Sequence, residues 1–266
     1  MVELLSGADE EVVAVSRGAR PKQAGNVRWA RGDIGDAAGL QPVLDGARAV
    51  FLLVPGELNT SGEAPAVLLD VVAGAKPERV VLVSSQIVGT RPGAVSHARL
   101  GEYEAAVRES GLDFTVLRPA GFASNAFAWA ETVRTRRRVY APFGDVALPV
   151  VDPADIAALG AAALVGDGHA GRTYVVTGPE AITPREQTAA IAEALVEEVT
   201  FAEVSRADAH AGMTRFMAEE MAAGSLDVLG APLPAEQQVS PDVEAALQRP
   251  AGSFAGWVAR HLPAFR

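Results

Sequence analysis

Polar side chains follow a buried-looking apolar run of the sequence at the point where a predicted strand ends. The run Val80–Val83 leads directly into Ser84, Ser85 and Gln86. Open α/β sheets bind their ligands at the carboxyl ends of the strands. Hydroxyl and amide groups at this point can bind a polar ligand or take part in proton transfer. We therefore expect a small-molecule site after this strand.

Several apolar runs, separated mostly by helical patterns, are expected to position these groups. The predicted strands of this region are Val12–Val15, Val27–Ala30, Ala49–Val54, Val80–Val83 and Phe114–Leu117. Strands that alternate with helices form a parallel sheet. The run Ala49–Val54 is almost continuously apolar, which is typical of a strand covered on both faces. The fold class is therefore α/β.

The pattern changes after residue 125. Thr183 and Glu186 form a capping-box signature at the start of a helix. The remaining predicted elements are strands at Thr173–Thr177 and Val199–Val204 and helices that include Phe216–Ala222 and Phe254–Leu262. We predict a sheet domain over residues 1–178 and a smaller, mostly helical domain over 179–266, with parts of 126–150 as candidates for the smaller domain.

Composition restricts the class of ligand. The chain has 266 residues, of which 49% are hydrophobic, and a net charge of -10. That charge disfavours nucleic acid and anionic membranes as direct partners. Because the sequence contains no cysteine, no signal peptide and no long apolar run, we expect a cytoplasmic protein that handles small molecules. The four histidines are scattered, so no metal site is predicted.

The segment around residues 110–125 resembles the NmrA-like group of atypical short-chain dehydrogenases. The shared elements are a Ser-Gly-Leu triplet, a strand ending in Leu-Arg-Pro, a Gly-Phe pair and a nearby asparagine. They stand at Ser110, Gly111, Leu112, Leu117, Arg118, Pro119, Gly121, Phe122 and Asn125. The resemblance implies an NAD(P)-binding, Rossmann-like, doubly wound parallel sheet with a smaller, mostly helical C-terminal substrate domain.

One element of that family is not found in this sequence. Its members open with a strand and a G-x-x-G-x-x-G turn, whereas Met1–Ser6, with Gly7 placed as a C-cap, is typical of the end of the first helix. Either the start was assigned too late or the chain binds its ligand differently. Without that strand, its two neighbours face an empty position in the sheet. We therefore expect rearranged pairing or low stability rather than an ordinary complete sheet.

The resemblance also implies a cofactor site. Where dinucleotide folds contact the adenosine ribose, an arginine accommodates a 2′-phosphate, so Arg17 favours NADP (NADPH). Arg17 is alternatively a solvated arginine at a strand end, and Asp33 either lies beside the adenine or caps the next helix. The implied cofactor-binding residues are Ser16, Arg17, Asp33, Ile34, Leu53, Val54, Pro55, Ser84, Ser85, Pro119, Gly121, Phe122 and Asn125.

The chemistry that the resemblance implies is hydride transfer to a quinone, enone or similar acceptor. The tyrosine-lysine pair of classical short-chain dehydrogenases does not occur, because no tyrosine is followed four residues later by a lysine. The candidate proton donors are Ser84, Gln86, His97 and Tyr103. Tyr103 shares a helical stripe with Leu100 and Val107, which is also typical of a core residue, and His97 is alternatively a surface residue at a helix start.

Two functions follow from these observations. The first is an NAD(P)H-dependent oxidoreductase that acts on a small, largely apolar carbonyl, enone or quinone. The second is a non-catalytic NADP-binding sensor or regulator, which would require a protein partner. A homodimer is compatible with either function.

Overall fold

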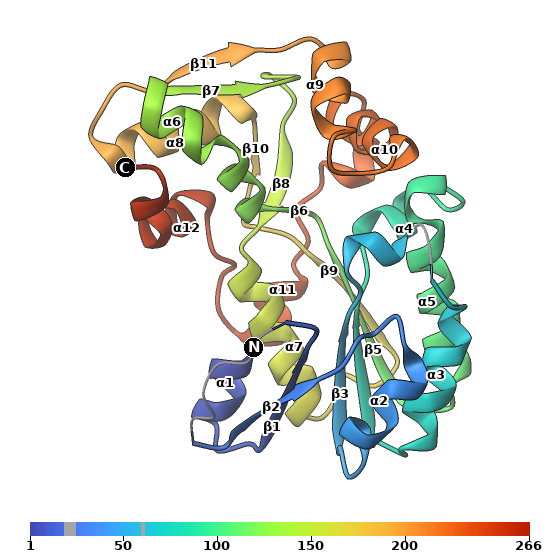
Figure 1. Cartoon of the computed structure of the whole chain (residues 1–266). Helices are drawn as coiled ribbons and strands as arrows, with labels where there is room; N and C mark the ends of the chain where they lie inside the picture. Colours follow the sequence, from blue (N-terminus) through green and yellow to red (C-terminus); the bar gives the residue numbers. More distant parts are fainter. Residues whose placement is uncertain (19–24, 60–61) are drawn as a thin grey trace.

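The structure is a computed structural model that describes residues 1–18, 25–59 and 62–266. Strands and helices alternate through its first part (Figure 1). The strands are β1 (Val12–Ser16), β2 (Val27–Arg31), β3 (Ala49–Leu53), β4 (Arg79–Val83), β5 (Asp113–Pro119) and β9 (Arg172–Val176). The α-helices are α1 (Val2–Gly7), α2 (Ala37–Leu44), α3 (Pro65–Gly74), α4 (Gln86–Thr90), α5 (Ala98–Glu109) and α7 (Pro153–Val165), with short 3-10 turns η1 (Gly56–Asn59), η2 (Val95–His97) and η3 (Ala123–Trp129).

All pairings between these strands are parallel, which confirms the predicted α/β fold class. The strands form two separate sheets, one of β1 and β2 and one in the order β3-β4-β5-β9. Within the described ranges, β1 pairs only with β2, and β3 pairs only with β4. Among the described strands, none pairs with the open side of β1 or of β3, so the sheet is interrupted at the expected position and the expected rearranged pairing is not found there.

The larger sheet is buried on both faces, as its apolar strands predicted. On one face, Val80 and Leu82 of β4 pack in a core formed with α2, α3 and α5. On the other face, Val81 and Val83 pack against α7. Figure 1 shows these helix layers on opposite sides of the sheet. Because helices pack on both faces, they hold the strands in place and so determine where the carboxyl end of each strand lies.

A second group of elements lies at one end of these layers. Its strands are β6 (Gly121–Phe122), β7 (Arg138–Ala141), β8 (Leu148–Val151), β10 (Ala181–Ile182) and β11 (Thr200–Glu203). Its helical elements are α6 (Ala130–Arg136), α8 (Pro184–Leu195), α9 (Arg206–Met213), α10 (Glu219–Gly230), η4 (Pro234–Glu236), α12 (Phe254–His261) and η5 (Leu262–Ala264). Helix α11 (Asp242–Leu247) instead packs against α7 and β9 (Figure 1). Because β7 pairs with β11 and β8 with β10, residues 138–151 join strands from beyond residue 178.

Some predicted boundaries were wrong. The helix expected from Phe216 begins only at Glu219, and Phe216 lies in a turn with 75% of its surface exposed. The strand expected to end at Leu117 continues through Pro119, because Arg118 and Pro119 pair with β9. Gly7 is the last residue of α1 rather than its cap.

Helix α7 is a meeting point for distant parts of the chain. It contacts α1 near one end of the sequence and α11 near the other. The buried carboxylate of Asp155 on α7 accepts the Gly252 N–H at 2.7 Å and pairs with Arg249, and the carboxylate of Asp152, which caps α7, pairs with Arg260 of α12. These contacts fasten the C-terminal segment to the centre of the fold.

Candidate functional site

The carboxyl ends of neighbouring parallel strands carry most of the residues that the sequence predicted. The registers of β3, β4 and β5 place Leu53, Val83 and Leu117 in one row. Ser84 and Gln86 therefore lie at the same edge as Pro55 and Gly121. This is the edge at which open α/β sheets bind ligands.

A hollow of about 300 Å³ lies at the carboxyl ends of β1 and β2. Arg17 and Asp33, both predicted, line it. Its lining residues are Arg17, Arg31, Gly32, Asp33, Asp36 and Gly39. Asp36 rather than Asp33 caps α2, by accepting the Gly39 N–H at 3.2 Å. Asp33 accepts the Gly35 N–H at 2.9 Å within the loop, so a place beside the adenine stays a prediction for Asp33.

Two other predicted residues near this hollow do not line it. The carbonyl of Ser16 accepts the Gly32 N–H at 3.1 Å, which holds the two strand ends together. Ile34 packs against the core beneath α2. Ser16 thus supports the hollow through its backbone, and Ile34 supports it through the core.

The Ser84 side chain is part of a buried ionic cluster. Its hydroxyl donates to Glu104 Oε1 of α5 at 2.6 Å, and Arg118 donates to both oxygens of the same carboxylate. Burial acts to raise the pKa of the Glu104 carboxyl, but hydrogen bonds from Arg118, Ser84 and Arg108 outweigh it and hold that pKa below its ordinary value. Sequence reasoning missed Glu104, because only the fold brings Arg118 to it.

Ser85 and Gln86 have local structural partners. Ser85 caps α4 by accepting the Ile87 N–H at 3.2 Å. The amide of Gln86 donates to the carbonyl of Ala235 at 3.2 Å, so a C-terminal segment lies over the strand end. Gln86 is only 6% exposed.

A second buried carboxylate, that of Glu236, fastens this C-terminal segment to α4. It accepts hydrogen bonds from Arg91 Nε at 2.7 Å and from the Thr90 hydroxyl at 2.8 Å, and it is 1% exposed. Arg91 also donates to the carbonyl of Ala231 at 2.8 Å. We call residues 231–237 the strap. Sequence reasoning missed it, because the contacts join residues about 145 positions apart.

The remaining proton-donor candidates occupy different environments. Tyr103 is 3% exposed and packs in the core with Leu100 and Val107, and burial raises the pKa of its phenol. His97 is half-buried, and one ring nitrogen lies 2.9 Å from the Ser96 hydroxyl. Burial lowers the pKa of the His97 imidazole. Tyr103 thus lies on the core side of α5, and His97 retains exposed surface.

The residues expected to lie along the rest of a dinucleotide, from its pyrophosphate to its nicotinamide, are partly accessible. Leu53 is 59% exposed, and Gly121 and Asn125 are exposed. Phe122 packs against the core beneath α7 and keeps part of its ring surface open. Val54 and Pro119 are buried and support this wall from behind. Pro55, which follows them at the same edge, is half-buried.

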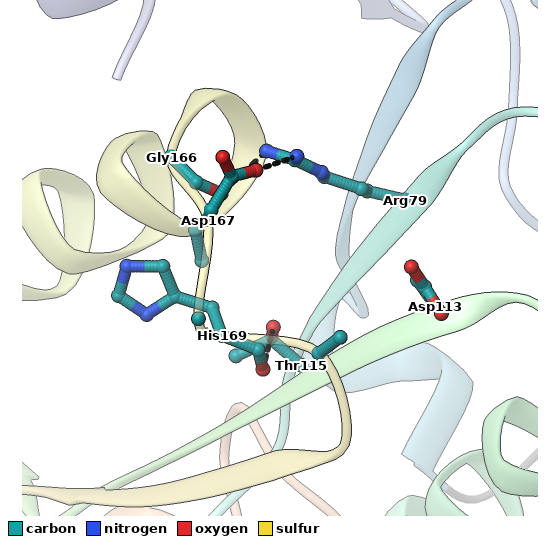
Figure 2. Close-up of a pocket in the computed structure, with 9 residues that line it drawn as sticks. Arg79, Asp113, Thr115, Gly166, Asp167 and His169 are labelled. Atoms are coloured by element: carbon teal, nitrogen blue, oxygen red, sulfur yellow. Dashed lines mark hydrogen bonds and ion pairs between the residues drawn. The ribbon is translucent and has the colours of Figure 1, made fainter.

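A separate cavity of about 150 Å³ lies at the opposite edge of the sheet (Figure 2). Arg79 and Asp113, the first residues of β4 and β5, line it together with His169. Arg79 pairs there with Asp167 at 2.5 Å and donates to the Gly166 carbonyl at the end of α7. Because this is the amino edge of the strands, the cavity does not belong to the predicted site.

The described ranges contain no cluster of three metal-ligating side chains. Over the same residues, no helix is both long and apolar enough to cross a membrane.

Comparison with known proteins supplies the family. A family model described as NAD(P)H-binding matches residues 1–167. The chain is 36% identical over 242 residues to a (4-alkanoyl-5-oxo-2,5-dihydrofuran-3-yl)methyl phosphate reductase of Streptomyces griseus, covering 90% of this chain and 84% of the relative. It is 31% identical over 254 residues to an NAD(P)H azoreductase of Xenophilus azovorans, covering 93% and 87% of the two chains.

The fold has close counterparts among solved structures. The structure of the NADPH-dependent quinone oxidoreductase QOR2 of Escherichia coli, in complex with NADPH, superposes with a TM-score of 0.80 at 22% identity. The match covers 98% of this chain and 94% of that chain. At this identity the likeness confirms the Rossmann-like fold.

Proposed function

Because this chain belongs to the NAD(P)H-binding family, we propose that it is an NADPH-dependent reductase that transfers hydride to a small, largely apolar carbonyl, enone or quinone. The two relatives described above are both named as reductases, one of a furanone and one of azo compounds. The observation that carries the proposal is the hollow at the ends of β1 and β2, where Arg17 stands in the position suited to a 2′-phosphate.

The described residues fit the two ends of a dinucleotide. Arg17 and Asp33 line the hollow for the adenosine end. Gly121 and Asn125 are exposed beside Phe122 for the nicotinamide end, where glycine permits close approach and the phenyl ring offers an apolar wall. In the ranges that the structure describes, no strand fills the position between β1 and β3, where family members carry their phosphate-binding turn.

The bound cofactor would supply the hydride, and the chain would supply orientation and a proton. Among the four predicted donors, Ser84, Gln86 and Tyr103 are buried, and the first two are engaged with Glu104 and the Ala235 carbonyl. His97 is half-buried and titratable. It is therefore the donor that this proposal assigns to the reduced oxygen of the acceptor.

Calorimetric titration with NADPH and NADH tests the cofactor. Arg17→Ala should weaken NADPH binding by about 10-fold or more and leave NADH binding unchanged, because a charge-assisted contact to a phosphate is lost. Arg28→Ala is a matched control, since Arg28 is an exposed arginine of β2 that does not line the hollow. Binding of neither dinucleotide would contradict the proposal.

Turnover is tested by following NADPH oxidation with a panel of quinones and enones. Steady oxidation with at least one acceptor is the expected result. Tight NADPH binding without oxidation by any acceptor would instead favour the non-catalytic regulator.

A further inference from the structure

Arg31 is a residue of the hollow to which sequence reasoning gave no role. It is the last residue of β2, and the parallel register pairs it with Ser16, directly before Arg17. Neighbouring strands lie about 4.8 Å apart. The two arginines therefore enter the hollow from adjacent strand ends, and both line it.

The guanidinium of Arg31 has no competing partner in the part of the chain that the structure describes. Its side chain is exposed, and it makes neither an ion pair nor a hydrogen bond there. By contrast, Arg91 and Arg118 are each committed to a buried carboxylate. An uncommitted arginine at a strand's carboxyl end is suited to a phosphate, because its planar fork matches phosphate oxygens.

The charges of the hollow show why one arginine would be insufficient. Asp33 and Asp36 line the same space and each carries a negative charge. With Arg17 alone, the lining would be net negative and would repel a phosphate. The charge of Arg31 cancels this excess. The two carboxylates then remain available to accept hydrogen bonds from hydroxyl or amino groups of a nucleoside.

We infer that Arg31 shares the 2′-phosphate of the cofactor with Arg17 and that this pair of arginines determines the preference for NADPH. The inference rests on the proposed function, because it assigns a second specificity residue to the same cofactor site.

Two nucleotide fragments isolate this contact from the rest of the cofactor. Adenosine 2′,5′-bisphosphate carries the 2′-phosphate, and adenosine 5′-monophosphate lacks it. In calorimetric titrations, Arg31→Ala should weaken binding of the bisphosphate by about 10-fold to 100-fold and leave binding of the monophosphate unchanged. In the Arg17→Ala/Arg31→Ala double variant, the two affinities should become nearly equal.

Two variants separate this effect from general damage. Arg28→Ala removes an exposed arginine from the same strand, roughly 10 Å before Arg31, and should change neither affinity. Arg31→Lys should recover part of the preference, because it keeps the charge but loses the fork. Because Arg31 is exposed, the Arg31→Ala and Arg31→Lys proteins should unfold at the same temperature as the wild type.

The alternative outcomes are distinguishable. If the Arg31→Ala variant binds the bisphosphate as tightly as the wild type does, the inference is wrong and the proposed function still stands. An equal loss for both fragments would also overturn it, since Arg31 would then read the adenosine or the 5′-phosphate. A wild-type chain that binds neither the fragments nor NADPH would contradict both proposals.

Discussion

Arg118 and Glu104 form a two-pronged ion pair, with Nε–Oε1 and Nη2–Oε2 distances of 2.9 and 2.7 Å. Glu104 is 1% exposed, and its carboxylate also accepts hydrogen bonds from Ser84 and Arg108. A single side chain of α5 thus joins the carboxyl ends of β4 and β5. The geometry of the predicted site depends on this carboxylate.

Removing the carboxylate should strongly destabilise the protein. Glu104→Ala leaves Arg118 and the Ser84 hydroxyl without their partner in a buried place, and breaking a buried pair in this way costs about 3–5 kcal/mol. Urea denaturation measures the loss. Glu102→Ala, on the exposed side of the same helix, removes a surface pair with Arg99 and should cost less than about 1 kcal/mol. Equal losses in the two variants would contradict the importance of the cluster.

The same carboxylate should make stability fall in acid. Because the pKa of folded Glu104 is lowered, its contribution is fully present above the pKa of an unfolded glutamate, roughly 4.3. It is lost as the pH falls through the folded pKa. The free energy of unfolding, measured by urea denaturation from pH 7 down to pH 3, should therefore fall less steeply in Glu104→Gln than in the wild type. Parallel curves would show that Glu104 does not titrate in this range.

The strap should be released when its ion pair is removed. In Arg91→Ala, Glu236 loses its cation and the Ala231 carbonyl loses its donor. Amide hydrogen exchange over residues 231–237 should become faster, while exchange in β4 stays slow. Arg206→Ala, which removes an exposed pair with Asp227 on α10, is the control and should leave the strap protected. Unchanged exchange in Arg91→Ala would mean that other contacts hold the strap.

If His97 donates the proton, the rate should rise as the solution becomes more acidic. Burial lowers the pKa of its imidazole below the ordinary value of roughly 6.5, so the ring is mostly neutral at pH 7. As the pH falls through that pKa, a growing fraction of the rings becomes protonated and can donate a proton to the acceptor. The pH dependence of kcat for NADPH oxidation should show this rise in the wild type and lose it in His97→Gln. Identical profiles would exclude His97 as the donor.

The open edge of β1 should promote self-association. Val13 and Val15 are 38% and 43% exposed on a strand that pairs on one side only among the described strands. Unpaired apolar edges template aggregation, and a lysine blocks them. Val15→Lys should therefore reduce light scattering on heating. Val67→Lys is matched in exposure, at 43%, but lies on α3 and should have little effect.

The strands were predictable because their side chains carry a local signal. Val80–Val83 is continuously apolar, and burial on both faces requires that pattern. The capping box of Thr183 and Glu186 is equally local, and it forms as expected at the start of α8. In each case, neighbouring residues in the sequence contain the whole physical cause.

The buried carboxylates were not predictable in the same way. Neither Glu104 nor Glu236 was predicted to be buried or to have a role, because a glutamate in the sequence carries no local sign of burial. Their partners, Arg118 and Arg91, come from elements that only the tertiary fold brings near. For Arg31, the strand end was predicted, but the shared hollow with Arg17 required the register between β1 and β2.

The contacts of α7 have a consequence for synthesis of the chain. Its surface is covered by α1 from one end of the sequence and by α11 and Arg249 from the other. During translation, α7 leaves the ribosome about eighty residues before α11 does. Its apolar surface therefore stays partly uncovered until the final tenth of the chain has emerged, and partly made chains should depend on chaperones during that interval.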